Sequence, residues 1–377
     1  MKILQIHNYY KTRGGESYVV YSEKRLLEKN NHDVLLHTAD NHDILNIISK
    51  RRNFYLELRR IVNTFKPDIV HIHNVFHIIG TDIYLEIKKY GIPIVQTLHN
   101  YRLLCINGLF YDDNQNICEL CRMGQYKYSL SKKCYQHSYI KSFFMKQKIE
   151  EFRKCALKYI DKYIALTHFS YDKYTKSGFP YDKIVVKPNF IINDERISFR
   201  DNKYALFIGR ISKEKGIKDL LNVFKDINFN LIVAGDGPQL KQLIMEYSHF
   251  SNISFVGYIM GKQKQEILKN CSFVVFPSLW YEMFPISILE AYSYSKAVVA
   301  SNIGGLAEIV ENGKTGFLFE VGNRNSFKSA INRILKNDKY IELGQSAKKI
   351  FNEEYTQERN YDMLIGIYNN VINGKNE

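Results

Sequence analysis

Two glutamates in the stretch FPSLWYEMFPISILEAYS (276–293) have a spacing that suits the binding of sugar hydroxyls. Pro285 favours a helix start and disfavours helical geometry at Phe284. We therefore expect Glu282 on a loop and Glu290 inside the helix. The helix N-terminus between them attracts an anion, and each carboxylate can accept two hydrogen bonds from a diol. Diols on either side of a pyrophosphate describe a sugar nucleotide; a helix cap plus a buried ion pair is the alternative.

A basic loop, GRISKEKG (209–216), follows a predicted strand. Its cations Arg210 and Lys215 are five residues apart, and the flanking glycines let the backbone turn tightly into a helix. Two cations beside a helix N-terminus suit a diphosphate. A basic surface turn is the alternative. The Gly-rich turn AGDGP (234–238) also follows a strand but carries little information alone.

The first half of the chain holds further candidates at strand ends. In TRGGESYVV, Gly15 allows close approach of the backbone to a ligand, and Glu16 begins a helix. His99, in TLHNYR, is expected at the carboxyl end of a strand and facing a cleft. His71 and His73 alternate along VHIHN and are interpreted as mainly structural. No G-x-G-x-x-G occurs in the chain, which argues against NAD and FAD enzymes.

These residues lie between short β-branched runs that alternate with helical stretches, which predicts parallel sheets covered by helices on both faces. In the first half we expect strands at 2–8, 33–38, 68–74, 92–100 and 162–167, and helices at 17–30, 42–65, 81–90 and 138–160. In the second half we expect strands at 204–210, 230–237, 253–258, 272–278 and 296–301, and a final amphipathic helix at 352–372. Two doubly wound α/β domains bind ligands outside the carboxyl ends of their strands.

Length and composition set the class of protein. A chain of 377 residues exceeds one ordinary domain of roughly 150–200 residues. With 45% hydrophobic residues it is not disordered. No apolar run reaches the ~18–20 residues of a membrane helix, and the start, MKILQIHNYY, turns polar too soon for a signal peptide. We expect a cytoplasmic protein.

The net charge of +14 is unevenly distributed. Residues 1–190 carry 30 Lys and Arg against 18 Asp and Glu, or +12, whereas residues 191–377 carry 23 against 21, or +2. A basic half attracts anionic lipid, nucleic acid or lipid-linked phosphate, unless it is only a solvated surface. The stretch SYIKSFFMKQK (138–148) places aromatic residues beside lysines, which suits an anionic membrane surface. An amphipathic helix that faces the sheet is the alternative.

Four of the six cysteines lie in an irregular segment, 101–137, with the spacing C-x12-C-x2-C-x12-C. In a reducing compartment such thiols favour a metal over disulfides. The segment needs a cross-link, and a tetrahedral four-thiolate site would supply it. We therefore predict structural zinc, with an Fe–S cluster, disulfides or free thiols as alternatives. The proposed ligands are Cys105, Cys118, Cys121 and Cys134; Cys155 and Cys271 are assigned to the core.

Taken in order, GRISKEKG, AGDGP, E-M-F-P-x-x-x-x-E and SNIGGLAEIVENGKTGFL (301–318) resemble the retaining glycosyltransferases of family 4. The resemblance covers essentially the whole chain. It implies the GT-B architecture, in which two Rossmann-like domains face each other across a cleft. The implied parts are an N-terminal acceptor domain (1–187), a linker (188–203), a nucleotide-sugar donor domain (204–351) and a C-terminal segment (352–377) that crosses back to the first domain.

The resemblance also implies roles for single residues. Arg210 and Lys215 would hold the donor diphosphate, Glu290 the ribose hydroxyls and Glu282 the hydroxyls of the transferred sugar. His99 would lie near that sugar. The implied catalytic set is Glu282, Arg210, Lys215 and His99; the implied donor-binding set is Gly15, Arg210, Lys215, Gly257, Tyr258, Met283, Phe284, Pro285, Ile286 and Glu290. The family usually has Gly where this chain has Met283, whose side chain would narrow the sugar pocket.

The implied reaction is transfer of a hexose-type sugar from a UDP- or GDP-linked donor, with retention and without a catalytic metal. The absence of a D-x-D spacing agrees with this. The leaving nucleoside diphosphate would be stabilised by Arg210, Lys215 and a helix dipole. A front-face displacement, in which the donor phosphate takes the acceptor proton, needs no protein nucleophile, so Glu282 and Glu290 are not a glycosidase pair.

The expected acceptor is a polysaccharide or a lipid-linked oligosaccharide of the cell envelope, reached from the inner face of the plasma membrane. A sugar-nucleotide epimerase with the same fold is a second hypothesis, and it predicts turnover without an acceptor. A basic nucleic-acid-binding protein is a third hypothesis. It predicts steeply salt-dependent binding, and no recognition-helix module supports it.

Overall fold

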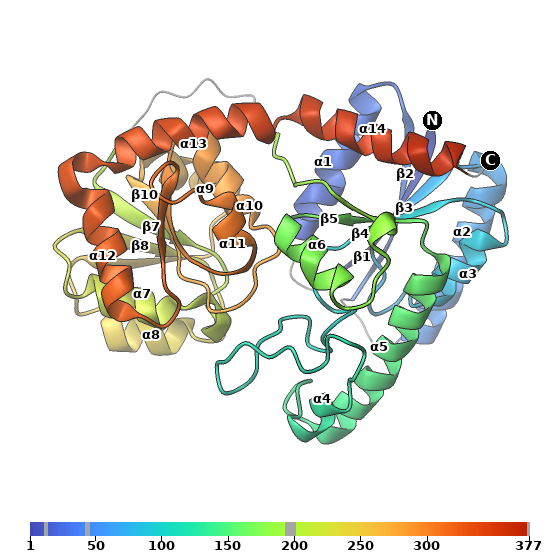
Figure 1. Ribbon diagram of the computed structural model, residues 1–377, viewed down its shortest axis with the longest axis horizontal. Helices are drawn as coiled ribbons and strands as arrows, with labels where there is room; N and C mark the ends of the chain where they lie inside the picture. The colour runs from blue at the N-terminus through green and yellow to red at the C-terminus, as the bar shows by residue number, and fades with distance from the viewer. Residues whose placement is uncertain (11–13, 42–45, 193–200, 375–377) are drawn as a thin grey trace. The chain divides into compact units, whose positions relative to one another are not determined.

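The computed structural model describes residues 1–10, 14–41, 46–192 and 201–374 of the chain (Figure 1). The chain divides into two compact units. The first unit comprises Met1–Phe110, Cys118–Phe190 and Gln357–Glu377, and the second comprises Tyr111–Ile117 and Ile191–Thr356. Part of the predicted linker, 193–200, and part of a predicted helix, 42–45, lie outside the described residues. None of the helices in the described ranges combines the length and apolar character needed to cross a membrane.

The first unit is built on a six-stranded sheet of order β2-β1-β3-β4-β5-β6, in which all neighbours are parallel. Its strands are β1 (Lys2–Tyr9), β2 (Asp33–Asp40), β3 (Ile69–Asn74), β4 (Ile94–Thr97), β5 (Lys162–Ala165) and β6 (Ile184–Val186). Its helices are α1 (Gly15–Lys29), α2 (Ile47–Phe65), α3 (Asp82–Lys88), α4 (Tyr128–Ser131), α5 (Tyr139–Tyr159), α6 (His168–Thr175), η1 (Tyr181–Lys183) and α14 (Gln357–Asn373).

The second unit is built on another six-stranded parallel sheet, of order β12-β11-β10-β7-β8-β9. Its strands are β7 (Tyr204–Ile208), β8 (Asn230–Ala234), β9 (Ile253–Gly257), β10 (Phe273–Phe276), β11 (Ala297–Ser301) and β12 (Gly316–Phe319). Its helices are η2 (Lys213–Lys215), α7 (Ile217–Phe224), α8 (Leu240–Tyr247), α9 (Gly261–Asn270), α10 (Ile286–Ser293), α11 (Gly304–Ile309), α12 (Arg324–Leu335), η3 (Lys336–Asp338) and α13 (Tyr340–Glu354).

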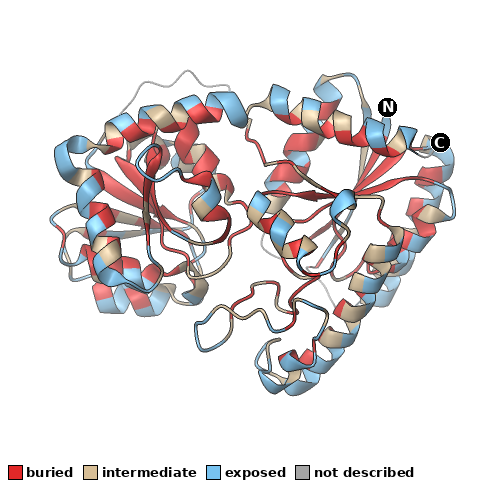
Figure 2. Cartoon of the chain, viewed as in Figure 1, coloured by how far each residue is buried: buried red, intermediate tan, exposed pale blue. Residues whose placement is uncertain are grey.

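The predicted doubly wound α/β class is confirmed in both units. Figure 2 shows the strands almost wholly buried between helices that each turn one buried face inward. In α7 the buried residues recur with helical spacing at Ile217, Leu220, Leu221 and Phe224, as expected of a helix that packs one face on a sheet. The sequence patterns missed β6, which has only three residues, and β12, whose run GFLF starts with a glycine directly after the turn residues NGKT.

The order of the strands locates one switch point in each sheet. The winding reverses between β1 and β3 in the first unit and between β7 and β10 in the second. Ligands of doubly wound sheets bind at such points, outside the carboxyl ends of the strands. The loops that leave β7 and β10 are 209–216 and 277–285, which are the two loops chosen from the sequence.

The predicted helix at 352–372 is wrong at its start, because two helices meet there. Helix α13 ends at Glu354 and α14 begins at Gln357. Between them Tyr355 leaves helical geometry (φ −120°, ψ 26°), and its ring packs against Phe284 with centroids 5.9 Å apart. Helix α14 then packs on the first sheet in a buried cluster formed by Ile3, Leu27, Ile69, Val95, Ile164, Leu364, Ile367, Tyr368 and Val371.

Candidate active site

Glu282 is the centre of a hydrogen-bonded group at the switch point of the second sheet. Its side chain is only 7% exposed. One carboxylate oxygen, Oε1, accepts from Lys215 Nζ at 2.5 Å and from Ser278 Oγ at 2.7 Å. The indole Nε1 of Trp280 donates to the same oxygen at 3.0 Å. The carboxylate of Glu282 therefore joins the loops after β7 and β10. A buried carboxylate needs such a cation beside it, because an unpaired buried charge is costly.

Glycines fix the backbone around this carboxylate. Gly216 has φ +66°, and a Cβ there would lie 1.9 Å from the carbonyl oxygen of Pro277. On the other side, the N–H of Gly305 donates to the carbonyl of Glu282 at 2.9 Å. A Cβ on Gly305 would lie 2.4 Å from the carbonyl oxygen of Met283. No side chain fits at either glycine without a backbone shift, so the loop that carries Glu282 is held from both sides.

Glu290 lies on α10 and is also paired with a lysine. Its Oε1 accepts from Lys264 Nζ of α9 at 2.5 Å. Its Oε2 is buried and has no hydrogen-bond partner among the described residues. An unpaired buried carboxylate oxygen is costly, and a ligand hydroxyl would satisfy it. Pro285 precedes the helix in extended geometry, and its carbonyl accepts from the Ile288 N–H at 3.1 Å. The N–H groups of Ile286 and Ser287 come before the first turn closes and have no partner inside the helix.

The remaining predicted donor residues lie along the same edge of the second sheet. Arg210 follows β7 and is exposed, with no ion pair to another described residue. Gly257 ends β9 with φ +71°, and its carbonyl accepts from the Gly235 N–H at 2.7 Å. Tyr258 is 61% exposed. In contrast, the side chains of Met283, Phe284 and Ile286 are buried, at 6–8% exposure.

In the first unit, half-buried His99 follows β4 and lies beside two buried histidines, His71 and His73. Its Nε2 lies 3.0 Å from Nδ1 of His73 on β3. His71, also on β3, lies 2.8 Å from the Thr97 hydroxyl and 2.7 Å from the Tyr368 hydroxyl. Burial lowers the pKa of His99 to about 3 and holds the pKa values of His71 and His73 well below the ordinary value. All three rings are therefore neutral at physiological pH.

A buried ion pair lies beneath these histidines. Lys187 Nζ donates to Glu23 Oε1 at 2.9 Å, and both side chains are 1% exposed. Glu23, His71 and His73 bring their ligand atoms within 4.8 Å of one another. The ammonium of Lys187 already occupies the place of a cation beside this carboxylate, and a second positive charge would be repelled. We therefore interpret the group as an ion pair with two neutral histidines.

Gly15 is the first residue of α1 and is exposed, directly after the loop from β1. In the same turn, Glu16 lies 3.7 Å from His7, and burial raises the pKa of Glu16 to about 8. Beside them, Arg102 donates to the Tyr10 hydroxyl at 2.8 Å. A small cavity of about 40 Å³ is lined by His73, His99, Arg102 and neighbours, which is enough for about one water molecule.

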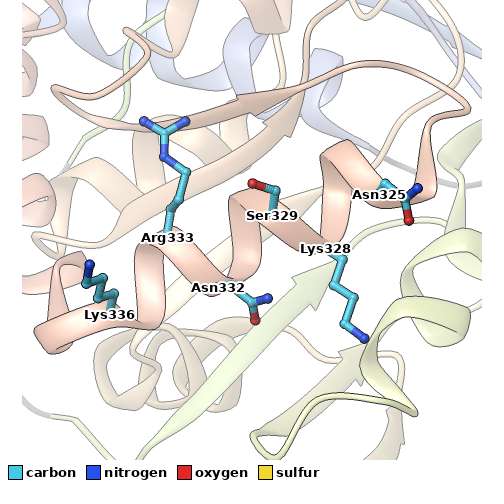
Figure 3. Close-up of a pocket in the computed structure, with 6 residues that line it drawn as sticks. All are labelled: Asn325, Lys328, Ser329, Asn332, Arg333 and Lys336. Atoms are coloured by element: carbon cyan, nitrogen blue, oxygen red, sulfur yellow. The ribbon is translucent and has the colours of Figure 1, made fainter.

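Another hollow, of about 380 Å³, lies over one face of α12 (Figure 3). It is lined by Asn325, Lys328, Ser329, Asn332, Arg333 and Lys336. All six residues come from this helix and its end, and the guanidinium of Arg333 stacks over the Phe317 ring at 4.0 Å. None of the residues predicted for a site lines this hollow, so it is a polar helix surface.

The partners of the predicted residues were not found from the sequence. Lys264, Ser278 and Trp280 contact the two glutamates, and none of the three was chosen from the sequence. Glu23 and Lys187 are 164 positions apart, and each lies in an ordinary helix or strand-end pattern. No local signal could have joined them.

Two family profiles together match residues 3–350 of the chain. The profile described as "Glycosyltransferase Family 4" matches residues 3–195. The profile described as "Glycosyl transferases group 1" matches residues 191–350.

Individual relatives agree with these profiles. An uncharacterized glycosyltransferase of Methanocaldococcus jannaschii is 26% identical over 333 residues, which are 82% of this chain and 76% of that protein. The alpha-D-kanosaminyltransferase of Streptomyces kanamyceticus is 25% identical over 186 residues, which are 47% of this chain and 48% of that protein.

Solved structures share the fold. Sucrose-phosphate synthase from Thermosynechococcus elongatus superposes with a TM-score of 0.72 at 16% identity, over 99% of each chain. The Anabaena protein HepE, solved with UDP and glucose, superposes with a TM-score of 0.68 at 17% identity, over 97% of this chain and 99% of that one.

Proposed function

Because the chain belongs to glycosyltransferase family 4, we propose that it transfers a hexose-type sugar from a nucleotide-diphosphate sugar, with retention and without a catalytic metal. The observation that carries this proposal is the group formed by Glu282, Lys215, Ser278 and Trp280 at the switch point of the second sheet. Such a group suits a ligand that combines negative charge with hydroxyls, as a sugar diphosphate does.

The donor is assigned to the second unit. The unpaired Oε2 of Glu290 is a ready acceptor for a ribose hydroxyl. Arg210, exposed and without an ion pair in the part of the chain that the structure describes, is available for the diphosphate. Lys215 already neutralises Glu282, so a diphosphate beside it would share its ammonium between two anions. The backbone carbonyl and N–H groups of Gly257 and Tyr258 are proposed to contact the nucleotide base.

The chemistry needs stabilisation of the leaving group more than a nucleophile. As the bond from the sugar carbon to the diphosphate oxygen breaks, negative charge grows on the phosphate. Arg210, Lys215 and the N-terminal amides of α10 are proposed to stabilise that charge. The acceptor hydroxyl oxygen would bond to the anomeric carbon on the face from which the diphosphate leaves, and it would give its proton to the departing phosphate oxygen. The new glycosidic bond then keeps the anomeric configuration. Glu282 would orient the sugar hydroxyls throughout.

The acceptor is assigned to the first unit, as a polysaccharide or a lipid-linked oligosaccharide. His99 is proposed to contact the transferred sugar and Gly15 the donor phosphates. Support for a membrane-bound acceptor comes from the start of α5, where Tyr139, Ile140, Phe143 and Phe144 are 39–67% exposed. Lysines interleave with these apolar side chains, a pattern that suits peripheral contact with an anionic membrane.

Calorimetric titration with UDP, GDP and ADP tests the donor assignment. We expect one nucleotide to bind, and Arg210→Ala to weaken it about tenfold or more by removing charge-assisted contacts. Lys218→Ala, a cation on the outer side of α7 that pairs with Glu246, is the matched control and should bind like the parent. If no nucleotide binds, or if both variants behave alike, the donor site is not where it is proposed.

Turnover then separates two reactions of one fold. A transferase consumes the sugar nucleotide faster when a glycan acceptor is added and forms a new glycosidic product. An epimerase converts the sugar nucleotide at full rate without any acceptor.

A further inference from the structure

We propose that Cys105, Cys118, Cys121 and Cys134 bind one structural Zn²⁺ as thiolates. None of the four is in a disulfide. They lie in a segment whose only helix, α4, has four residues. A segment of this length without regular structure needs a local cross-link to hold one conformation. The site is separate from the proposed donor site, so it can fail without affecting that proposal.

Two of the cysteines occupy turns of the same form. Cys105 is followed three residues later by Gly108, with φ +76°, and Cys121 by Gly124, with φ +82°. In both turns the glycine N–H donates to the cysteine carbonyl at 2.9 Å. At Cys105 the backbone N–H groups of residues 107–110 are directed at the sulfur. These N–H groups point at the sulfur as they would at a metal-bound thiolate, which is the form of cysteine that binds metal.

The other two cysteines are held close to Cys121. The sulfur of Cys121 is within electrostatic range of the sulfurs of Cys105, Cys118 and Cys134. The Cys118 N–H donates to the Phe110 carbonyl at 2.8 Å, which places it beside the Cys105 turn. No three of the four sulfurs lie within 4.8 Å of one another, so binding would draw the cysteine turns inward until each sulfur reaches the Zn–S bond length of about 2.3 Å.

Zinc fits this donor set better than the other cations. Four soft thiolates in a closed tetrahedral arrangement are typical of structural zinc. The carboxylates near the sulfurs are engaged elsewhere: Glu119 pairs with Lys173 and Arg122. The thiolates alone would then hold the ion.

Metal content of the full-length protein tests the proposal. We expect one zinc per chain by elemental analysis, released by a thiol-blocking mercurial and detected with a zinc indicator. Cys121→Ser should lose the metal, whereas Cys155→Ser, a thiol on α5 outside the four, should retain it. Because Cys121→Ser could fail to fold, the parent protein is also stripped with a chelator. Near-ultraviolet circular dichroism of its tyrosines should change and should recover when zinc is added back.

Three outcomes would overturn the zinc site. They are a folded parent protein with no metal and four reactive thiols, a disulfide among the four cysteines in the mass spectrum, and iron with visible absorption in place of zinc.

A second inference rests on the buried histidines and depends on the proposed function. We infer that His73 and Glu23 are positioning residues that fix the tautomer of His99. His73 Nε2 lies 3.4 Å from Glu23 Oε2, and neither atom has a hydrogen-bond partner among the described residues. Each is the other's nearest complement. On its opposite side, His73 Nδ1 lies 3.0 Å from His99 Nε2.

The protons follow from the chemistry of the three groups. A carboxylate only accepts, so the neutral His73 ring carries its proton on Nε2, toward Glu23. Its Nδ1 is then an acceptor, and His99 must donate from Nε2. The Nδ1 atom of His99 is left with a lone pair, which can accept a hydrogen bond from a sugar hydroxyl. Lys187 holds Glu23 in place, and Asn360 of α14 holds Lys187 at 3.1 Å.

Nitrogen-15 NMR of the imidazoles tests this assignment without a substrate. We expect the Nε2–H tautomer for His99 in the parent protein and a mixture of tautomers in His73→Phe. His32→Phe, at the Tyr361 contact, is the matched control and should leave the His99 signals unchanged. In turnover, His73→Phe should lower kcat more than it raises KM for the donor.

The two levels of this inference fail separately. An Nδ1–H tautomer of His99 in the parent protein overturns the positioning role of His73 and Glu23, whatever the activity. A parent protein that turns over no sugar nucleotide overturns the proposed function, while the tautomer assignment can still hold.

Discussion

The two sheets equip their switch points with opposite chemistry. At the second sheet, two glutamates are each paired with a lysine at 2.5 Å, and Arg210, on the loop after β7, is exposed. At the first sheet, His71 and His73 are buried, His99 is half-buried, and all three are neutral. The paired ions at the second sheet suit charged ligands, because each ion can exchange its partner for a substrate group. The neutral histidines at the first sheet suit uncharged hydroxyls, because rings with fixed protons give directional hydrogen bonds and do not attract charge.

The largest expected effect tests the charged switch point. Glu282→Gln keeps the shape but removes the charge that binds Lys215, Ser278 and Trp280. If Glu282 orients the sugar in the transition state, kcat should fall about a hundredfold or more. Initial rates at saturating donor measure this. Glu214→Gln, on the neighbouring loop and bonded to Ser212 at 2.6 Å, should keep its rate. A Glu282→Gln variant with normal kcat would remove this glutamate from the mechanism.

Nucleotide affinity gives the next largest effect. Glu290→Gln replaces the oxygen proposed for the ribose with an amide, so the Kd of the nucleotide should rise about tenfold to a hundredfold, or ~1.5–3 kcal/mol. Calorimetry measures it. Lys264→Met separates the carboxylate from its ion pair, because it removes the lysine and leaves Glu290 in place. Equal Kd values for Glu290→Gln and the parent would mean that the buried oxygen does not face the nucleotide.

Because the histidines at the first sheet are neutral, we expect the free energy of unfolding of the first unit to fall as the pH is lowered. Burial holds the pKa values of His71 and His73 well below the ordinary value, whereas in the unfolded chain they protonate near pH ~6.5. Below that pH the unfolded state binds more protons, so the free energy of unfolding decreases as pH falls. Each histidine contributes up to about 2 kcal/mol of loss between pH ~6.5 and pH ~5.

Urea unfolding at several pH values across this window measures the loss. His249→Gln, an exposed residue of the second unit, should leave the pH slope unchanged. A first unit whose stability is flat across this window would show that its histidines are not held neutral.

The smallest expected effect concerns the surface of the basic half. Phe144 is 64% exposed on α5, and Phe144→Glu should weaken binding to vesicles rich in anionic lipid about tenfold. Ile48→Glu, at an even more exposed apolar residue of α2 (83%), is the matched control. Vesicle sedimentation measures both. If the two variants bind alike, α5 does not contact the membrane.

The sequence predicted what depends on local patterns. Most strands, the loops 209–216 and 277–285 and the helix start after Pro285 follow from short-range rules and are in place. The ends of strands are less exact, because β4 and β8 each end three residues before the predicted ends at 100 and 237. The partners of the chosen residues follow from tertiary packing, so Lys264 and the Glu23–Lys187 pair were missed. The break at Tyr355 was missed for the same reason, because that ring leaves the helix for a contact with Phe284.

The position of α14 has a consequence for synthesis of the protein. The first sheet begins at Lys2, but its last buried partners, Leu364, Tyr368 and Val371, are translated after the whole second unit. Domains usually fold in the order in which they leave the ribosome. Here the first unit emerges first but keeps an apolar face of its sheet uncovered until α14 is synthesised. The second unit can therefore complete its folding before the first. A premature stop codon that removes α14 would therefore yield a complete second unit and an aggregation-prone first one.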